Sequence, residues 1–211
     1  MENNHINFWI ENAHSKCKKK HFHLNNDKPS PENVKKPLGA IVMAADFPIE
    51  PHELTNAPPG SFYVIRNAGG IVPPAAGDGM DLAIGAALEF AVKVYRVQHI
   101  IILLNPKCGL LNCLLEQDAE GVGVIAAGQY LPIWANLVTP ALTRFGNSRE
   151  EKELMLEFCS QELTRVSFEN LMTYRWVLDS VFDGSLTLHG WYCDIDKGDF
   201  KYFEPSSDKF I

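Results

Sequence analysis

The chain has 211 residues, 46% of them hydrophobic, which is enough to bury a substantial core in one domain and excludes a disordered chain. Its formal charge of −7 at pH 7, with clustered cations only in the run Lys16 to Lys20, excludes a nucleic-acid-binding surface. No stretch reaches the roughly 20 apolar residues of a membrane span, and the N-terminus lacks an apolar signal region, so we expect a cytoplasmic protein with no membrane partner.

Residues 1–37 are expected to form a basic N-terminal arm that precedes one folded body, residues 38–211. Residues 5–24 are rich in His, Asn and Lys around a few apolar side chains, a pattern that predicts an amphipathic arm docked on the body or on a second subunit. The arm also holds a cluster of potential metal ligands, namely His14, Cys17, His21 and His23. Their spacing matches no closed structural zinc site and the intervening lysines oppose a dication, so we expect no metal there.

The segment 38–45 (LGAIVMAA) is a short run of small and branched apolar residues followed by Pro48 and Pro51, which predicts a buried strand. Residues 61–66 repeat this pattern. After the loop IVPPAAGDG, residues 82–94 have apolar side chains at helical spacing, which predicts a helix beginning near residue 80.

A continuous apolar run at 99–104 predicts another buried strand, and LLNCLLEQ at 110–117 predicts a helix. The alternation of strand and helix predicts a parallel sheet in an α/β domain. Ligands of such sheets collect at the carboxyl ends of the strands. Asp46 and Cys108 both follow predicted strands, so we expect them to share a pocket.

The last third of the chain predicts a long helix and then a hairpin. Ser148 and Glu151 form a capping box ahead of a helix that extends to about Tyr174. LTLHGWYCDI at 186–195 and a strand at 200–203 flank a turn, which predicts an antiparallel pair. The predicted fold is therefore α/β, with a mostly parallel sheet flanked by helices and a C-terminal antiparallel hairpin.

Four motifs occur in order along the body: AADFP at 44–48, RNAGGIVPP at 66–74, HIIILLNPKCG at 99–109 and LTLHGWYCDI at 186–195. In this order the chain resembles the beta class of carbonic anhydrases over nearly all of residues 38–200. The motifs of that family are Cys-x-Asp-x-Arg, Arg-Asn-x-x-Asn, His-x-x-Cys-Gly and Leu-His-Gly-Trp. Gly70 is a minor departure, because the family commonly has Asn there.

The resemblance implies that two of the three zinc ligands are missing. The first zinc Cys of the family falls on Ala44, the zinc His on Asn105 and the second zinc Cys on Cys108. The aspartate falls on Asp46, and its arginine partner on Pro48. Without three donors, a zinc ion cannot be held to acidify water, so we expect no metal cofactor and no CO2 hydration.

The residues that correspond to the family's site form the candidate small-molecule site: Ala44, Asp46, Arg66, Asn67, Gly69, Gly70, Asn105 and Cys108. Cys108 is either a packed thiol or a nucleophile whose pKa is lowered by the following helix and Lys107. Asp46 either caps backbone amides or acts as a base, and Asn105 is either a turn residue or a donor to a bound anion or carbonyl.

Two functions remain open from the sequence, and hydratase activity rescued by unorthodox metal binding is a weaker third. One is a pseudoenzyme that binds a small anion or serves as a regulatory or scaffolding protein. We expect it to form a homodimer or homotetramer, or to pair with an active relative. The other is a metal-independent lyase or hydrolase that uses Cys108, Asp46 and Asn105 on a carbonyl or acyl substrate. The five cysteines are odd in number and widely spaced, which predicts no disulfide framework and a reducing compartment.

Overall fold

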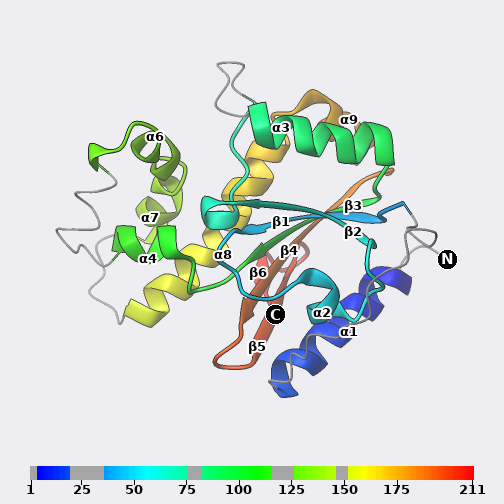
Figure 1. Cartoon of the computed structure of the whole chain (residues 1–211), viewed down its shortest axis with the longest axis horizontal. Helices are drawn as coiled ribbons and strands as arrows, with labels where there is room; N and C mark the ends of the chain where they lie inside the picture. Colours follow the sequence, from blue (N-terminus) through cyan, green and yellow to red (C-terminus); the bar gives the residue numbers. More distant parts are fainter. Residues whose placement is uncertain (1–3, 20–35, 76–81, 116–125, 146–151) are drawn as a thin grey trace.

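The computed structural model describes residues 4–19, 36–75, 82–115, 126–145 and 152–211 (Figure 1). The strands lie in the order β2-β1-β3-β4-β5-β6. Their bounds are β1 Gly39–Ala44, β2 Phe62–Asn67, β3 His99–Leu104, β4 Thr187–Asp194, β5 Asp199–Glu204 and β6 Lys209–Phe210. The strands β1 to β4 pair in parallel, while β4 with β5 and β5 with β6 pair antiparallel. The predicted fold class is confirmed.

Strands β1 and β3 are buried along their whole length, as their unbroken apolar sequences predict. In their register Ile41 pairs with Ile101 and Met43 with Leu103. Because side chains alternate along a strand, the even-numbered and odd-numbered residues of β1 and β3 enter two separate cores on opposite faces of the sheet, except that Ala44 at the end of β1 belongs to the core of the odd-numbered residues.

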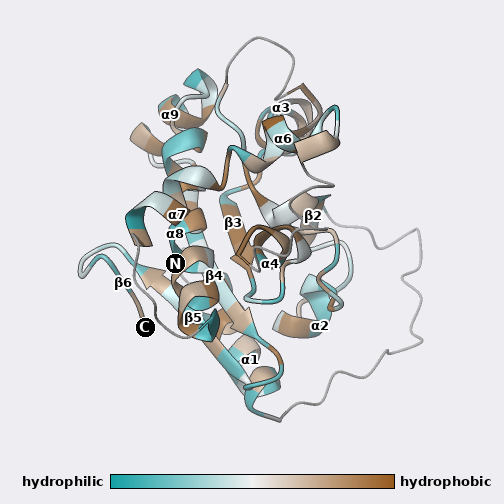
Figure 2. Ribbon diagram, turned by 90° about the vertical axis from the view of Figure 1, so that its left-hand side faces the viewer, coloured by the Kyte–Doolittle hydropathy of each residue, from teal (hydrophilic) through white to brown (hydrophobic). Residues whose placement is uncertain are grey.

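The helices divide between these two faces (Figure 1). Their bounds are α1 Asn4–Lys19, α2 Pro51–Thr55, α3 Leu82–Glu89, α4 Gly109–Leu115, α6 Leu131–Ala135, α7 Thr139–Phe145, α8 Lys152–Leu171 and α9 Arg175–Phe182. The long helix α1 and the short helix α2 cover one face, and α3, α8 and α9 cover the other. In Figure 2 strand β3 is mostly hydrophobic, whereas α1 carries both polar and apolar residues.

The N-terminal helix α1 packs on the body of its own chain. Ile6, Trp9, Ala13 and Cys17 lie on one face of the helix and are all buried. The indole of Trp9 meets the ring of Phe62 on β2 edge-on, with ring centroids 4.6 Å apart. The predicted amphipathic arm is thus a docked helix over residues 4–19, whereas the boundary between an arm of 1–37 and a body of 38–211 stays a prediction.

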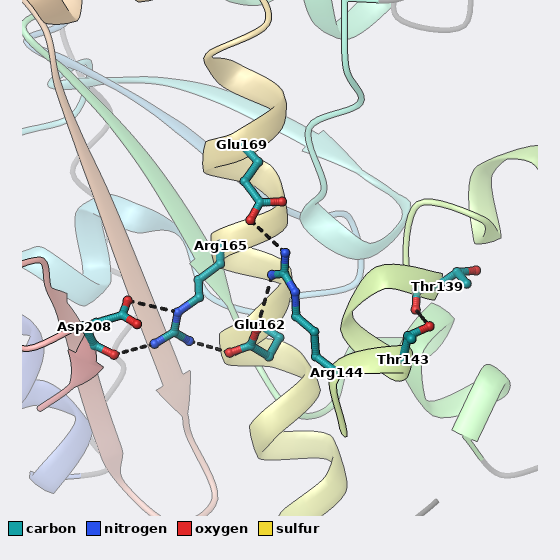
Figure 3. A network of polar contacts seen from close by, with 7 residues as sticks. All are labelled: Thr139, Thr143, Arg144, Glu162, Arg165, Glu169 and Asp208. Carbon is teal, nitrogen blue, oxygen red and sulfur yellow. Dashed lines mark hydrogen bonds and ion pairs between the residues drawn. The ribbon is translucent and has the colours of Figure 1, made fainter. Parts of the chain in front are cut away.

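A network of ion pairs connects α8 to neighbouring elements (Figure 3). The carboxylate of Glu162 is buried between two guanidinium groups, 3.3 Å from Arg144 and 2.5 Å from Arg165. Arg144 also pairs with Glu169 at 2.7 Å, and Arg165 contacts the side chain and the backbone carbonyl of Asp208. The network therefore joins α7, α8 and the segment before β6.

Some local predictions need correction. The helix expected over 82–94 is α-helical only to Glu89 and continues as a π-helical stretch, Phe90–Tyr95. The short elements α2, α6, α7, α9 and β6 were not predicted. The capping box residues Ser148 and Glu151 lie outside the described residues, as do the arm residues His21 and His23. Among the described residues no helix is long and apolar enough to cross a membrane.

Candidate functional site

The parallel neighbours β1 and β3 end side by side, at Ala44 and Leu104. The loops that follow these two strands therefore meet at one edge of the sheet. A hydrogen bond joins them, because Gly109 N–H donates to Asp46 Oδ2 at 2.7 Å. The segments around Asp46 and Cys108 therefore lie together, whereas the expectation that the two side chains share a pocket stays a prediction.

The contact with Asp46 leaves little room for a side chain at position 109. A Cβ atom at position 109 would lie 2.7 Å from Asp46 Oδ2, which is closer than real Cβ atoms approach an oxygen. The glycine leaves room for the carboxylate to reach the amide at the start of α4. Asp46 therefore accepts a hydrogen bond from a backbone amide, which is the first of the two roles considered for it. The amide follows β3 and does not belong to the loop that contains Asp46.

Cys108 is buried, with 3% of its surface exposed. Burial raises the pKa of its thiol and the nearby carboxylate of Asp46 raises it further, against a partial lowering by the amides of Leu111 and Leu110. Lys107 does not act on the thiol, because its ammonium pairs with Asp196. Burial thus opposes the thiolate that the nucleophile alternative requires and favours the packed thiol.

Asn105 is also buried, with 5% of its surface exposed. Its backbone carbonyl accepts hydrogen bonds from Ser160 Oγ at 3.2 Å and from the amide of Cys108 at 3.4 Å. Its side-chain nitrogen Nδ2 has no hydrogen-bond partner within the described part of the chain. A buried donor without a partner is costly, and the described residues supply no acceptor for this nitrogen.

Arg66 is held by the segment that follows β1. Its guanidinium donates to the backbone carbonyls of Phe47 at 2.8 Å and Ile49 at 3.2 Å, and it pairs with Glu50 at 2.8 Å. The cation that Asp46 lacks at Pro48 is thus present nearby, but it organises the backbone that follows β1.

Three further candidate residues shape backbone in the same region. Asn67 makes two hydrogen bonds with the backbone of Ile71, at 2.9 and 3.0 Å. Gly69 and Gly70 have φ angles of 85° and 64°. A Cβ on Gly70 would lie 2.7 Å from the backbone nitrogen of Ala44, so glycine is required there. These three residues support β1, and a contact of theirs with a ligand stays a prediction.

A cavity of about 110 Å³ lies beside Asn105. Its lining residues are Phe47, Pro48, Asn105, Pro106, Lys107, Cys193, Asp194, Ile195 and Asp196. The contribution of β4 and its turn was missed by sequence reasoning. Part of this contribution could have been inferred. β4 is the parallel neighbour of β3, so its carboxyl end lies at the same edge of the sheet.

The donor set at this edge does not fit the zinc ion that the fold would suggest. A catalytic zinc is held by three donors of the Cys, His or carboxylate type. Ala44 ends in a methyl group, Asn105 ends in a neutral amide, and the carboxylate of Asp46 is engaged by an amide. Only Cys108 remains as a strong donor. No group of three or more His, Cys, Asp or Glu side chains suited to a metal occurs in the described ranges.

A sequence profile of the carbonic anhydrase family matches residues 39–200. The chain belongs to the beta-class carbonic anhydrase family, as its motifs suggested. The carbonic anhydrase of Synechococcus elongatus is 28% identical over 166 residues, which cover 77% of this chain and 58% of that protein. Beta carbonic anhydrase 3 of Arabidopsis thaliana is 26% identical over 194 residues, 87% of this chain and 73% of that one. The chain therefore spans little more than half of the length of the cyanobacterial relative.

Solved structures agree with this assignment. The beta-carbonic anhydrase CcaA has a TM-score of 0.69 and 27% identity over 84% of this chain and 78% of its own. A tetrameric beta-carbonic anhydrase from Sordaria macrospora has a TM-score of 0.64 and 22% identity over 80% of this chain and 81% of its own, which shows a shared fold.

Proposed function

We propose that this protein is a beta-carbonic anhydrase homologue that holds no catalytic zinc and does not hydrate CO2. The observation that carries the proposal is the donor set, in which a methyl group and a neutral amide replace a thiolate and an imidazole. A thiol and a carboxylate alone leave a zinc ion short of one protein ligand. Without a bound metal, the pKa of water stays near 15.7 and no hydroxide forms at neutral pH.

The proposed role is that of a pseudoenzyme, in which the pocket binds a small anion and the protein acts in regulation or as a scaffold. The cavity beside Asn105 has room for a molecule of about the size of bicarbonate. The buried amide of Asn105 supplies a donor for an acceptor oxygen. Lys107 is the cation in the cavity lining, and its pairing with Asp196 is open to competition from an anion because both side chains are mostly exposed.

The alternative, a metal-independent lyase or hydrolase, receives less support. It needs Cys108 as a thiolate, yet burial raises the pKa of this thiol. It also needs a base close by, and His99 is bound instead to His189 at the opposite end of β3. Asp46, the remaining candidate base, already accepts the amide of Gly109.

An oligomer is part of the proposal. The Sordaria macrospora homologue is described as tetrameric, and the same fold in this chain supports assembly into a homodimer or homotetramer. A hetero-oligomer of this chain with an active relative is the second form of assembly proposed. Light scattering on the purified chain gives the mass of the homo-oligomer directly, and a mass equal to one chain at micromolar concentration contradicts this part.

Ligand binding is tested by isothermal titration with bicarbonate against a chloride control. We expect bicarbonate to bind wild type and to bind Asn105→Leu at least tenfold more weakly. Leucine fills a similar volume and removes the unpartnered amide, so the variant is expected to be as stable as wild type or more stable. Equal binding of bicarbonate to both proteins, or no binding to wild type, contradicts the anion site.

A further inference from the structure

Two cysteines from distant parts of the chain meet inside the core. Cys17 on α1 and Cys193 on β4 have their Sγ atoms 3.2 Å apart, although 176 positions separate them in the sequence. Both side chains are fully buried. A disulfide bond is about 2.05 Å long, so the two sulfur atoms have to approach by only about 1 Å to form one.

The position of this pair is fixed from two sides. On the helix side, Ile6, Trp9 and Ala13 hold the buried face of α1 in register against the sheet. On the sheet side, the turn between β4 and β5 passes so close to α1 that a Cβ on Gly198 would lie 2.7 Å from the carbonyl oxygen of Cys17. Helix α1 also packs against β5, which lies next to it (Figure 1).

We propose that Cys17 and Cys193 form a reversible disulfide that locks α1 onto the sheet when a small-molecule disulfide, such as oxidised glutathione, is in excess. One protein thiolate attacks the small disulfide, breaks its S–S bond and forms a mixed disulfide, and the first small thiol leaves with a proton. The second protein thiolate then attacks the cysteine sulfur of the mixed disulfide and releases the second small thiol. The two protein thiols thus lose two electrons and two protons, which the two released thiols carry.

The reaction requires α1 to move outward first. In the closed protein the hydrogen bond to Cys17 and burial both raise the pKa of Cys193, so its thiol stays protonated and shielded from the oxidant. Once formed, the bond closes a loop of almost the whole chain, which restricts the unfolded state strongly. Cys193 also lines the cavity beside Asn105, so the bond lies in the wall of the candidate site.

The test uses the full chain as wild type, Cys17→Ala and, as a control at another buried cysteine, Cys159→Ala. After equilibration with oxidised glutathione, non-reducing digestion and mass spectrometry are expected to find residues 17 and 193 joined in wild type and in Cys159→Ala. The link is absent from Cys17→Ala. We expect oxidation to raise the Tm of wild type by roughly 5–15 °C, reversed by dithiothreitol.

Separate glutathione adducts on the two cysteines, or no link in a protein that stays folded, would overturn the proposal. If Cys17→Ala fails to fold, Cys193→Ala takes its place. Hydrogen exchange of the wild type gives a second readout that needs no variant. Amides of α1 are expected to exchange at least tenfold more slowly in the oxidised protein, and equal exchange rates in the two redox states would contradict the lock.

Discussion

The carboxylate of Asp46 lies 2.7 Å from the backbone nitrogen of Gly109 and accepts its hydrogen bond. This contact ties the loop after β1 to the first turn of α4. It explains how Asp46 keeps its place although Pro48 stands where the family has an arginine. The interaction is between a carboxylate and an amide, so it requires neither a metal nor a cation.

Gly109→Ala tests this relationship. The added Cβ displaces the carboxylate, so we expect a loss of about 1–3 kcal/mol in the free energy of unfolding, measured by urea denaturation. The matched control is the same substitution in an Asp46→Ala background. There the clash is absent, and the cost of Gly109→Ala is expected to fall below about 1 kcal/mol. Equal costs in both backgrounds would show that the carboxylate is not the atom displaced.

Glu162→Ala tests the network around α8 (Figure 3). Removal of the buried carboxylate leaves Arg144 and Arg165 without their shared partner, and we expect a loss of about 2–3 kcal/mol. The control is Glu89→Ala, which breaks an exposed ion pair with Lys93 and is expected to cost less than about 0.5 kcal/mol. Similar losses in the two variants would mean that the network contributes no more than a surface pair.

The two histidines His99 and His189 predict a loss of stability in acid. Their rings are bonded through Nδ1 of His99 and Nε2 of His189 at 3.1 Å. Burial, followed by the neighbouring His99, lowers the pKa of His189 to about 3, and burial also lowers the pKa of His99. The unfolded chain therefore takes up protons from about pH 6.5 downward while the folded chain does not.

Stability due to these groups is present above about pH 6.5 and declines as the pH falls toward 3. Since His189 is only partly shielded from solvent, we expect a loss of about 1–2 kcal/mol between pH 7.5 and pH 5 from the pair. Urea denaturation across this range checks the slope. His189→Asn is expected to flatten it, and a slope equal to that of wild type would assign the acid sensitivity to other groups.

Rebuilding the missing donors is expected to restore metal binding. Ala44→Cys combined with Asn105→His adds a thiolate and an imidazole to Cys108, which completes a three-donor zinc site. We expect the double variant to retain one zinc ion per chain after dialysis, measured by elemental analysis. Adding Cys108→Ser to it is expected to abolish retention. Zinc retained equally by wild type and the double variant would contradict the account of the lost site.

Much of the fold follows from sequence because the signals are local and consistent. The unbroken apolar runs of β1 and β3 can be buried only in a sheet covered on both faces, and the hairpin of β4 and β5 is marked by its turn. The π-helical stretch after Glu89 has no mark in the sequence; in the structure its residues Phe90 and Tyr95 contact each other and Tyr63 on β2. The helices α6 and α7 have only 5 and 7 residues, which is too short for a repeating pattern of apolar residues to mark them in the sequence.

The candidate site was predictable in its position but not in its contacts. Motif order identified Asp46, Asn105 and Cys108 as neighbours. The raised pKa of Cys108, the unpartnered amide of Asn105 and the pairing of Lys107 with Asp196 depend on burial and on the turn after β4. These are long-range effects that a single sequence does not reveal. The meeting of Cys17 with Cys193 is of the same kind, because wide spacing gave no hint of contact.

Whether the protein lacks a catalytic zinc is measured by stopped-flow CO2 hydration with the wild-type chain after incubation with excess zinc and removal of free metal. We predict a rate that equals the buffer background, together with far less than one zinc ion per chain. A rate well above background that disappears in Cys108→Ser, with one zinc ion bound per chain, would contradict the account.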